Sequence, residues 1–278
     1  MRLQLPDTAD ELLKSFKSKH RSQIKKSADY HLQVDFGGEQ FLPEFYSVFA
    51  RNMRDLGTPV FAKRLFSSLL HEFAGDAEIC LVKKEGQTIA AALLVHLADL
   101  SEVPSASSLR EFNRTNANML MYWHLLQRTI QRGNRTFDYG RSSESSGTYR
   151  FKRQWGATPS PANWQYYVRS GSPEDMRPDS QGKKRLVKVW QRLPVPLTKW
   201  IGPTIVRGIP CQPVVSGLLK HDSGNKNCGD RYCGRFNSID SLPKVNRLKT
   251  VCDGTLVFRF APSTLGTDRN MDSRVIVT

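Results

Sequence analysis

This sequence lacks several features, and each absence excludes a class of protein. No apolar run reaches the roughly 18–20 residues that a membrane-spanning helix needs. The first residues, Met1–Asp7, contain no apolar core of the kind that a signal peptide carries. We therefore predict a cytoplasmic protein without a transmembrane segment.

Cysteine is scarce, with five residues in the whole chain. An odd count, with Cys80 inside a predicted core strand, does not suit a disulfide framework. Cys228 and Cys233 are five positions apart, but no second pair at zinc-finger spacing follows them. The sequence therefore predicts no metal site.

Acidic residues are outnumbered: 26 Asp and Glu stand against 41 Lys and Arg, for a formal net charge of +15. Such an excess is typical of proteins that meet a polyanion, whether nucleic acid, a phosphorylated sugar or anionic lipid. The alternative is that the basic residues only keep the protein soluble. With 278 residues, 39% of them hydrophobic, the chain has room for one large domain, alone or with an appendage.

The spacing of apolar residues predicts both helices and strands. Near-continuous apolar runs at 79–82 and 89–95 indicate a hairpin of central strands that are covered on both faces. A stripe from Met119 to Ile130 predicts the most regular helix. The expected elements are helices over 8–27, 39–56, 61–73 and 110–132, strands over 31–36, 78–83, 88–98, 102–107, 137–139 and 163–169, and a short helix within 143–155. We therefore predict an α+β fold, α/β-like, in which helices flank a mixed central sheet.

The composition changes after Arg169. Residues 170–185 are rich in Ser, Gly, Pro, Asp and Lys and indicate a linker, which leads into a basic, tryptophan-containing segment ending at residue 210. Residues 211–278 are polar and weakly periodic, so we expect a poorly ordered tail, apart from an apolar stretch at Thr255–Phe260. The predicted organisation is a domain over 1–169, a linker with its basic and aromatic segment over 170–210, and an atypical tail over 211–278.

Four stretches carry a family resemblance: FYSVFARNMRDLGTP at 45–59, SSLR at 107–110 with NMLMYW at 118–123, FDYGRSS at 137–143, and GTYRFKRQWGA at 147–157. They resemble the FemAB-related proteins associated with PEP-CTERM/exosortase and exopolysaccharide gene systems and, more broadly, the FemABX and GNAT-like N-acyltransferases. The resemblance spans residues 8–210 and implies that 1–169 is a GNAT-like acyltransferase domain. It also implies transfer of an aminoacyl or acyl group to an amine on a cell-envelope or exopolysaccharide precursor.

The chain departs from the family pattern in two places. Family members usually carry two GNAT-like halves, and we expect this chain to begin at or just before the second half. Ser105 stands where the resemblance leads us to expect a tryptophan, and this loss would open a void or trim a substrate wall. The tail after Pro210 has no counterpart in the family.

Acyl transfer to an amine requires deprotonation of the acceptor, stabilisation of the developing oxyanion and alignment of the donor. Phe151-Lys152 matches a Phe-Lys step near the acyl donor of FemABX enzymes, so the resemblance implies that Lys152 stabilises charge near the scissile ester, with Phe151 beside it. An ammonium near an aromatic face suits that role. The alternative is a surface lysine beside a core phenylalanine.

Asp138 ends a predicted strand, where reactive groups are common. It is a candidate general base or acceptor-orienting group, and the alternative is an Asp that pairs with Arg141 to hold the loop. The candidate substrate-binding residues near it are Arg141, Ser142, Ser143 and Tyr149.

Two helices supply further candidates for substrate binding. Arg21 and Lys25 are candidates to clamp phosphates of a nucleotide-linked sugar or a tRNA, unless this is simply a solvated charged face. Asn52 and Arg54 lie on the helix before Gly57 and would line the acceptor cleft or cap the loop that follows.

The acyl donor is inferred from a missing motif. Coenzyme-A-dependent GNAT enzymes hold the pyrophosphate with Arg/Gln-x-x-Gly-x-Gly/Ala at a helix start, and this sequence lacks that pattern. We therefore expect aminoacyl-tRNA as the donor rather than acyl-CoA, and no bound cofactor. A tRNA would also account for the basic charge.

Two other functions stay open at this point. A basic RNA-binding module without catalytic activity would explain the charge and would bind in a strongly salt-dependent way. Residues 186–207 resemble an interfacial helix that makes peripheral membrane contact, although Pro194, Pro196 and Pro203 interrupt it.

Overall fold

The computed structural model describes residues 1–144, 146–160, 181–207, 245–251 and 255–260. The chain divides into two compact units, Met1–Pro210 and Cys211–Thr278. In the second unit the described residues form an antiparallel hairpin of β7 (Val245–Val251) and β8 (Thr255–Phe260). The strand expected at 163–169 and the Cys228/Cys233 pair lie outside the described residues.

A six-stranded mixed sheet organises the first unit, in the order β1-β6-β5-β4-β3-β2. Its strands are β1 (Arg2–Gln4), β2 (Gln33–Gly37), β3 (Ala77–Lys84), β4 (Gln87–Leu97), β5 (Leu100–Ser108) and β6 (Thr136–Asp138). All neighbours pair antiparallel except β5 and β6, which run parallel. The predicted α+β fold with a mixed sheet flanked by helices is therefore confirmed.

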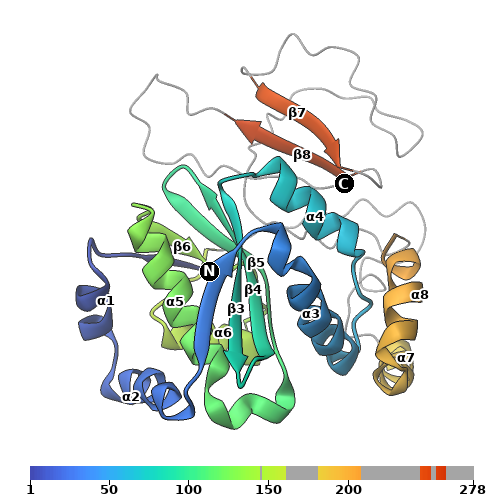
Figure 1. Cartoon of the computed structure of the whole chain (residues 1–278), viewed down its shortest axis with the longest axis horizontal. Coiled ribbons are helices and arrows are strands. Elements are labelled where there is room, and N and C mark those ends of the chain that lie inside the picture. The colour runs from blue at the N-terminus through green and yellow to red at the C-terminus, as the bar shows by residue number, and fades with distance from the viewer. Residues whose placement is uncertain (145, 161–180, 208–244, 252–254, 261–278) are drawn as a thin grey trace. The chain divides into compact units, whose positions relative to one another are not determined.

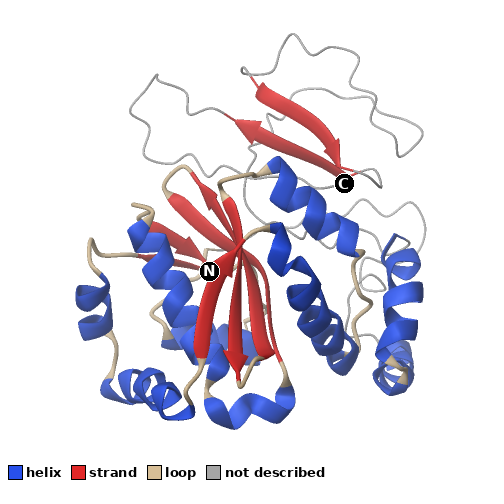
Figure 2. Ribbon diagram, in the orientation of Figure 1, coloured by secondary structure: helices blue, strands red, loops and turns tan. Residues whose placement is uncertain are grey.

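The helices of the first unit are α1 (Ala9–Ser15), α2 (Ser18–Lys26), α3 (Leu42–Leu56), α4 (Lys63–Glu72), α5 (Ala117–Gln131), α6 (Gly147–Gln154), α7 (Gln181–Arg192) and α8 (Val195–Arg207), with short 3-10 helices at Ser27–Tyr30, Glu39–Phe41 and Arg110–Thr115. Figure 1 shows α1, α2 and α5 on one side of the sheet and α3, α4 and α8 on the other. Figure 2 shows the same two-sided covering by element type.

The central strands are buried on both faces because helices cover both. From Ile79 to Val82, every side chain of β3 is fully buried, and the same holds from Ile89 to Leu94 in β4. Neighbouring side chains in a strand point to opposite faces, and Cys80 and Val82 belong to the core that contains α1, α2 and α5. This confirms the prediction drawn from the two apolar runs.

The helix predicted over 8–27 is two helices, not one. Phe16 and Lys17 take extended backbone angles between α1 and α2 (ψ 147° and 149°). The break turns the buried Phe16 ring edge-on to Trp123 and Trp155, at centroid distances of 6.2 and 5.4 Å. Burying a large aromatic ring outweighs the loss of one helical turn.

Three other boundaries differ from the prediction. Strand β1 was not expected at all, since three residues carry no periodicity and form a strand only through pairing with β6. The helix predicted from 110 starts at Ala117, because Asn116 takes a left-handed conformation with φ 57°. The linker predicted over 170–185 already contains the first turn of α7, from Gln181.

Two glycines set the distance between α3 and the last two helices. Gly57 ends α3 in a left-handed conformation with φ 77°, and a Cβ there would lie 2.3 Å from a methyl of Val187. A Cβ on Gly202 of α8 would lie 2.8 Å from the backbone nitrogen of Val60. The absence of side chains at these two positions lets α7 and α8 pack closely on the body of the domain.

Candidate active site

The sheet contains one place where two parallel strands separate. Strand β6 pairs with the first three residues of β5 and ends there, while β5 continues to Ser108. Glu102 and Asp138 face one another in this register, so their side chains lie on the same face of the sheet. Both are buried, with exposed fractions of 1% and 5%. Two carboxylates are therefore placed in the interior at the point where β6 ends.

Helix α6 brings a lysine to the same point. The helix begins after Ser146, whose hydroxyl accepts the N–H of Tyr149 at 3.1 Å as an N-cap. In its last turn Lys152 is 7% exposed and donates from Nζ to the carbonyl oxygens of Gly140 (3.2 Å) and Arg141 (2.8 Å). We refer to Glu102, Asp138 and Lys152 as the junction cluster.

Burial changes the protonation of this lysine. Removal from water lowers the pKa of Lys152 to about 8, and the charges of Asp138 and Glu102 offset only part of that effect. Both protonation states are therefore populated near neutral pH. With two N–H groups bound to carbonyls, the protonated side chain keeps one further N–H.

Asp138 is held by donors from the chain start and from its own loop. It accepts the N–H of Gly140 at 2.8 Å, the Nε–H of Arg2 at 3.1 Å and the amino group of Met1 at 3.4 Å. Gly140 takes φ 70°, which favours glycine and lets the chain turn straight after β6. These contacts tie β1 to the loop after β6, which is the loop that Lys152 also holds.

Aromatic rings pack around Phe151, the residue before Lys152. Phe151 is half-buried and stands edge-on to Tyr122 at 5.1 Å between ring centroids, and Tyr122 stacks on Tyr139 at 5.5 Å. Burial raises the pKa of both tyrosine hydroxyls, so both stay protonated at physiological pH. Phe151 therefore packs into the core while its neighbour Lys152 turns toward the loop.

Comparison with known proteins identifies the domain. A sequence profile of the acetyltransferase (GNAT) domain family matches residues 14–153, half of the chain. The chain belongs to the GNAT acetyltransferase family. The match covers both carboxylates and the lysine of the junction cluster. No curated protein matches.

The structure of FemX supports the fold of this GNAT domain, and other solved structures resemble it more weakly. The structure of FemX matches with 19% identity and a TM-score of 0.50, over 56% of this chain and 57% of that one. The C-terminal domain of a putative lysylphosphatidylglycerol synthetase from Agrobacterium fabrum matches at 14% identity and a TM-score of 0.41, over 52% of this chain and 55% of that one. The acetyltransferase AAC(6')-Iy, in complex with a coenzyme A bisubstrate analogue, matches with 11% identity and a TM-score of 0.42. The match covers 50% of this chain and 99% of that one. The chain thus spans little more than half of the FemX structure it resembles.

The GNAT domain gathers seven of the predicted site residues around one loop. Asp138, Phe151 and Lys152 lie at its two ends, and the intervening residues shape its turn: the carbonyl of Ser143 accepts the hydroxyl of Ser146 at 2.7 Å. The remaining members of this group are Arg141, Ser142 and Tyr149, of which Arg141 is exposed and the other two are half-buried. These predictions therefore share one location.

Four predicted residues lie on other elements. Asn52 on α3 donates to the Ser107 hydroxyl of β5 at 3.2 Å. Arg54 pairs with Asp55 at 2.6 Å and donates to the carbonyl of Leu193 beyond α7, so it joins two helices. On α2, Arg21 and Lys25 are exposed, and the Arg21 guanidinium donates to the carbonyl of Phe16 across the α1–α2 break. The GNAT domain thus leaves these four residues outside the loop group.

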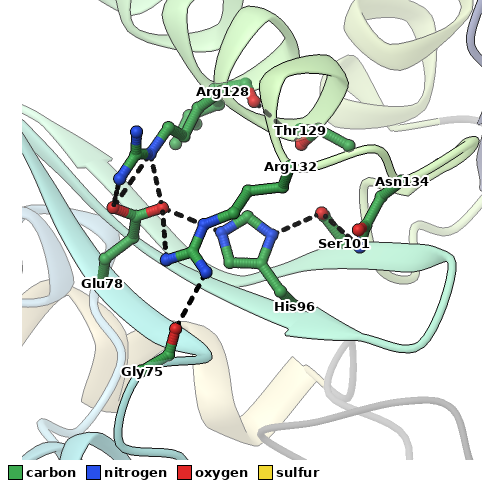
Figure 3. A network of polar contacts seen from close by, with 9 residues as sticks. Gly75, Glu78, His96, Ser101, Arg128, Thr129, Arg132 and Asn134 are labelled. Carbon is green, nitrogen blue, oxygen red and sulfur yellow. Dashed lines mark hydrogen bonds and ion pairs between the residues drawn. The ribbon is translucent and has the colours of Figure 1, made fainter.

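A second buried cluster on the opposite face of the sheet was not predicted. Figure 3 shows Arg128 and Arg132 reaching from the end of α5 toward Glu78 of β3. The Glu78 carboxylate accepts hydrogen bonds from Nε and Nη2 of Arg128 at 2.8–3.1 Å, and one of its oxygens lies 2.8 Å from His96 Nε2. His96 Nδ1 lies 2.8 Å from the Ser101 hydroxyl, which also accepts from Asn134 at 3.1 Å. We call these residues the Glu78 cluster.

The Glu78 cluster has the residue types of a hydrolytic triad but not the access. Ser101 is fully buried and points into the α5 side of the sheet. Burial alone would raise the pKa of Glu78, but hydrogen bonds from His96 and Arg128, and their charges, lower it to about 2. A permanently ionised, fully bonded carboxylate suits a structural clamp on β3, β4, β5 and α5. The signal in the sequence is a polar residue beside each apolar run, Glu78 before 79–82 and His96 after 89–95. The two come together only through the strand register.

Proposed function

We propose that this chain is a FemAB-type N-acyltransferase in which Lys152 stabilises the charge that develops on the acyl donor. The observation that carries the proposal is a buried lysine held at the separation of two parallel strands, with its remaining N–H uncommitted to the two carbonyls it binds. Belonging to the GNAT acetyltransferase family supports acyl transfer as the reaction class.

The chemistry follows from where charge appears. When an amine attacks an acyl carbonyl, the carbonyl oxygen becomes an oxyanion, and a preorganised N–H donor in a site shielded from water stabilises it more than the ground state. Lys152 is fixed by Gly140 and Arg141, so it loses little freedom when it donates. Phe151 packs edge-on to Tyr122 and so fixes the turn of α6 that also carries Lys152.

Asp138 takes a positioning role in this proposal. Its carboxylate already accepts hydrogen bonds from Gly140 and Arg2, so it fixes the loop that presents the lysine's carbonyl partners. Arg141, Ser142, Ser143 and Tyr149 then offer polar groups to the acceptor at the surface side of the loop. In this scheme the acceptor amine loses its proton to solvent or to substrate. As the oxyanion collapses, the bond from the acyl carbon to the donor breaks, and the leaving atom of the donor takes up a proton from solvent.

The donor we propose is an aminoacyl-tRNA rather than acyl-CoA. Residues 109–116 connect β5 to α5, contain no glycine and fold largely as a 3-10 helix. A loop of that kind lacks the open run of backbone N–H groups that a pyrophosphate cradle uses. The net charge of +15 suits a nucleic-acid donor.

The acceptor we propose is an amine on a cell-envelope or exopolysaccharide precursor. This rests on the resemblance of the four sequence stretches to FemAB-related proteins of PEP-CTERM/exosortase systems. Arg21 and Lys25, both exposed on α2, would contact phosphates of the precursor or of the tRNA. Asn52 and Arg54 are proposed contacts of the acceptor at the α3 side.

The test is acyl transfer by the full chain from labelled aminoacyl-tRNA and labelled acetyl-coenzyme A, offered separately with an envelope-precursor extract. Lys152→Ala is compared with Arg153→Ala, an exposed basic neighbour on the same helix. Transfer from one donor that Lys152→Ala abolishes and Arg153→Ala preserves would establish both reaction class and donor. A folded wild-type chain that transfers from neither donor, yet binds RNA equally well with and without Lys152, would replace this proposal with the noncatalytic RNA-binding function.

A further inference from the structure

Helices α7 and α8 are fixed to the domain by one side. Trp190 of α7 is 8% exposed, and Thr198 of α8 is fully buried. Gln191 donates to the carbonyl of Asp55 at 3.0 Å, and Gly202 lies against the backbone of Val60. These contacts pack the pair against α3 and the segment that follows it.

Both helices nevertheless expose large apolar side chains, where solvent-facing helices are normally polar. Six large hydrophobic side chains are exposed in the part of the chain that the structure describes, and five of them lie on these two helices. Trp200 is 78% exposed, and its companions are Leu186 (69%), Val189 (59%), Leu197 (39%) and Ile205 (41%). We call these five residues the α7–α8 face. Scattered exposed residues need no explanation, but a concentration on one pair of helices marks an interaction surface.

The segment that carries this face has charge of one sign. Residues 181–207 contain no Asp or Glu but seven basic residues: Lys183, Lys184, Arg185, Lys188, Arg192, Lys199 and Arg207. Lys188 and Arg192 are exposed on α7 beside the apolar side chains. A segment with exposed apolar side chains and only cationic charges of its own is complementary to a surface that is apolar beneath and anionic above.

The prolines divide the segment rather than preventing helix formation. Leu193 and Pro194 lie between α7 and α8, and Pro196 falls in the first turn of α8, where a proline is tolerated. The result is two short helices instead of one interfacial helix. Among the described residues no helix is both long and apolar enough to span a membrane.

We propose that the α7–α8 face docks the protein onto an anionic lipid bilayer, with Trp200 inserted at the level of the headgroups. The indole suits this position because it has an apolar body and a polar N–H. Lysine and arginine add attraction to anionic lipid, while the leucine and valine side chains enter the acyl boundary. An RNA partner would match the charges but leave the aliphatic side chains in water. This inference does not depend on the proposed acyl transfer.

The experiment is flotation of the full chain with vesicles of phosphatidylcholine alone and of phosphatidylcholine with phosphatidylglycerol. We expect binding to the anionic vesicles, and a fall of about tenfold in the partition coefficient for Trp200→Ser, given the transfer free energy of a large aromatic side chain. Leu186→Ser with Val189→Ser should produce a fall of similar size. Trp200→Phe is the matched variant that keeps an apolar ring and should retain most of the binding.

Two further readouts separate insertion from simple charge attraction. Vesicles with brominated acyl chains should quench tryptophan fluorescence in the wild type, and Trp200→Phe should lose that quenching while still floating. Lys188→Gln should weaken anionic binding about fivefold, as expected for one cation near a charged surface, whereas Lys19→Gln on α2 should change little. Binding that survives both serine variants, or no binding to either vesicle by the folded chain, would overturn the proposal.

Discussion

Two clusters of buried charge meet on strand β5 yet differ in how their members are satisfied. Ser101 belongs to the Glu78 cluster and its neighbour Glu102 to the junction cluster, so the two lie on opposite faces of the sheet. Glu78 has direct hydrogen bonds from Arg128 and His96. Lys152, by contrast, is bound to two backbone carbonyls, while the carboxylates nearest to it act on it through their charge.

The difference appears in the pKa values. Direct partners hold the pKa of Glu78 at about 2, well below its ordinary value, so the charged form is the stable one. Burial without a bonded carboxylate brings the pKa of Lys152 down to about 8, so its charge is conditional. Breaking the hydrogen bonds of a fully paired buried ion destabilises a fold. A group with a perturbed pKa at a strand end is instead a candidate for chemistry.

The largest expected effect comes from breaking the complete cluster. Glu78→Ala leaves His96 buried without its carboxylate and Arg128 without its bidentate partner, so we expect a loss of about 3–4 kcal/mol in the free energy of unfolding. Urea unfolding of the full chain, followed by circular dichroism, measures it. Glu85→Ala removes a carboxylate whose side chain is 86% exposed and should change stability by less than about 0.5 kcal/mol. Equal effects of the two substitutions would show that the Glu78 cluster is not a clamp.

The second effect concerns activity rather than stability. Lys152→Met keeps most of the side-chain volume but removes the N–H donors, and we expect kcat to fall about 100-fold, as when one oxyanion donor is lost. The same variant should lose less stability than Glu78→Ala, because it also removes a charge from the interior. Turnover and melting temperature measured on one preparation decide the point. A variant that unfolds but keeps its turnover when folded would make Lys152 a structural residue.

The conditional charge of Lys152 also predicts a pH profile. A protonated lysine is required for oxyanion stabilisation, so the activity that depends on Lys152 should decline as pH rises through about 8. Lys152→Arg, which stays charged, should shift this decline upward or remove it. A profile that instead rises through the same pH, and flattens in Lys152→Met, would assign Lys152 to proton abstraction.

Acid unfolding tests the contribution of Glu78 to stability. The pKa of Glu78 is lower in the folded chain than its ordinary value of 4.5, so its contribution to stability is complete above about pH 4.5 and is lost as pH falls toward 2. We expect a loss on the order of 2 kcal/mol over that range, and a flatter curve for Glu78→Gln. Denaturant midpoints between pH 5 and pH 3 would test this, with Glu85→Gln as the control.

The two clusters were not equally accessible to sequence reasoning. Phe151-Lys152 and Asp138 belong to contiguous stretches with a family resemblance, and a strand that ends at Gly140 is a local signal. Glu78, His96 and Arg128 are far apart in sequence and come together only through antiparallel register and the packing of α5. Local patterns therefore predicted Asp138 and Lys152, whereas Glu102 and the Glu78 cluster depend on strand pairings that no short stretch encodes.

The same distinction explains the errors in the elements. The runs that became β3 and β4 were predicted because burial on both faces demands continuous apolar residues. Strand β1 was missed because its stability lies in β6, not in its own three residues. The break between α1 and α2 was missed because a favourable helical pattern continued across it, and the tertiary contacts of Phe16 decided the backbone.

His20 gives the smallest expected effect and a third type of buried group. It is 5% exposed, its ring lies edge-on to Trp155 at 4.2 Å, and its Nε2 has no hydrogen-bond partner among the described residues. Burial lowers the pKa of His20 below its ordinary value of 6.5, so the unfolded chain binds a proton that the folded chain resists. Stability should therefore fall modestly as pH drops below about 6.5, before Glu78 begins to titrate.

His20→Phe keeps the edge-on ring packing and removes the titration, so it should flatten the stability curve between pH 7 and pH 5.5 while leaving the acid limb due to Glu78 in place. Burial also lowers the pKa of His124, and His124→Gln serves as the comparison variant at a half-buried site. If His20→Phe removes only the loss of stability between pH 7 and pH 5.5, and Glu78→Gln removes only the loss at lower pH, the two buried groups act independently. Loss of both limbs in either variant would show that one cooperative unit links α2 to the Glu78 cluster through α5.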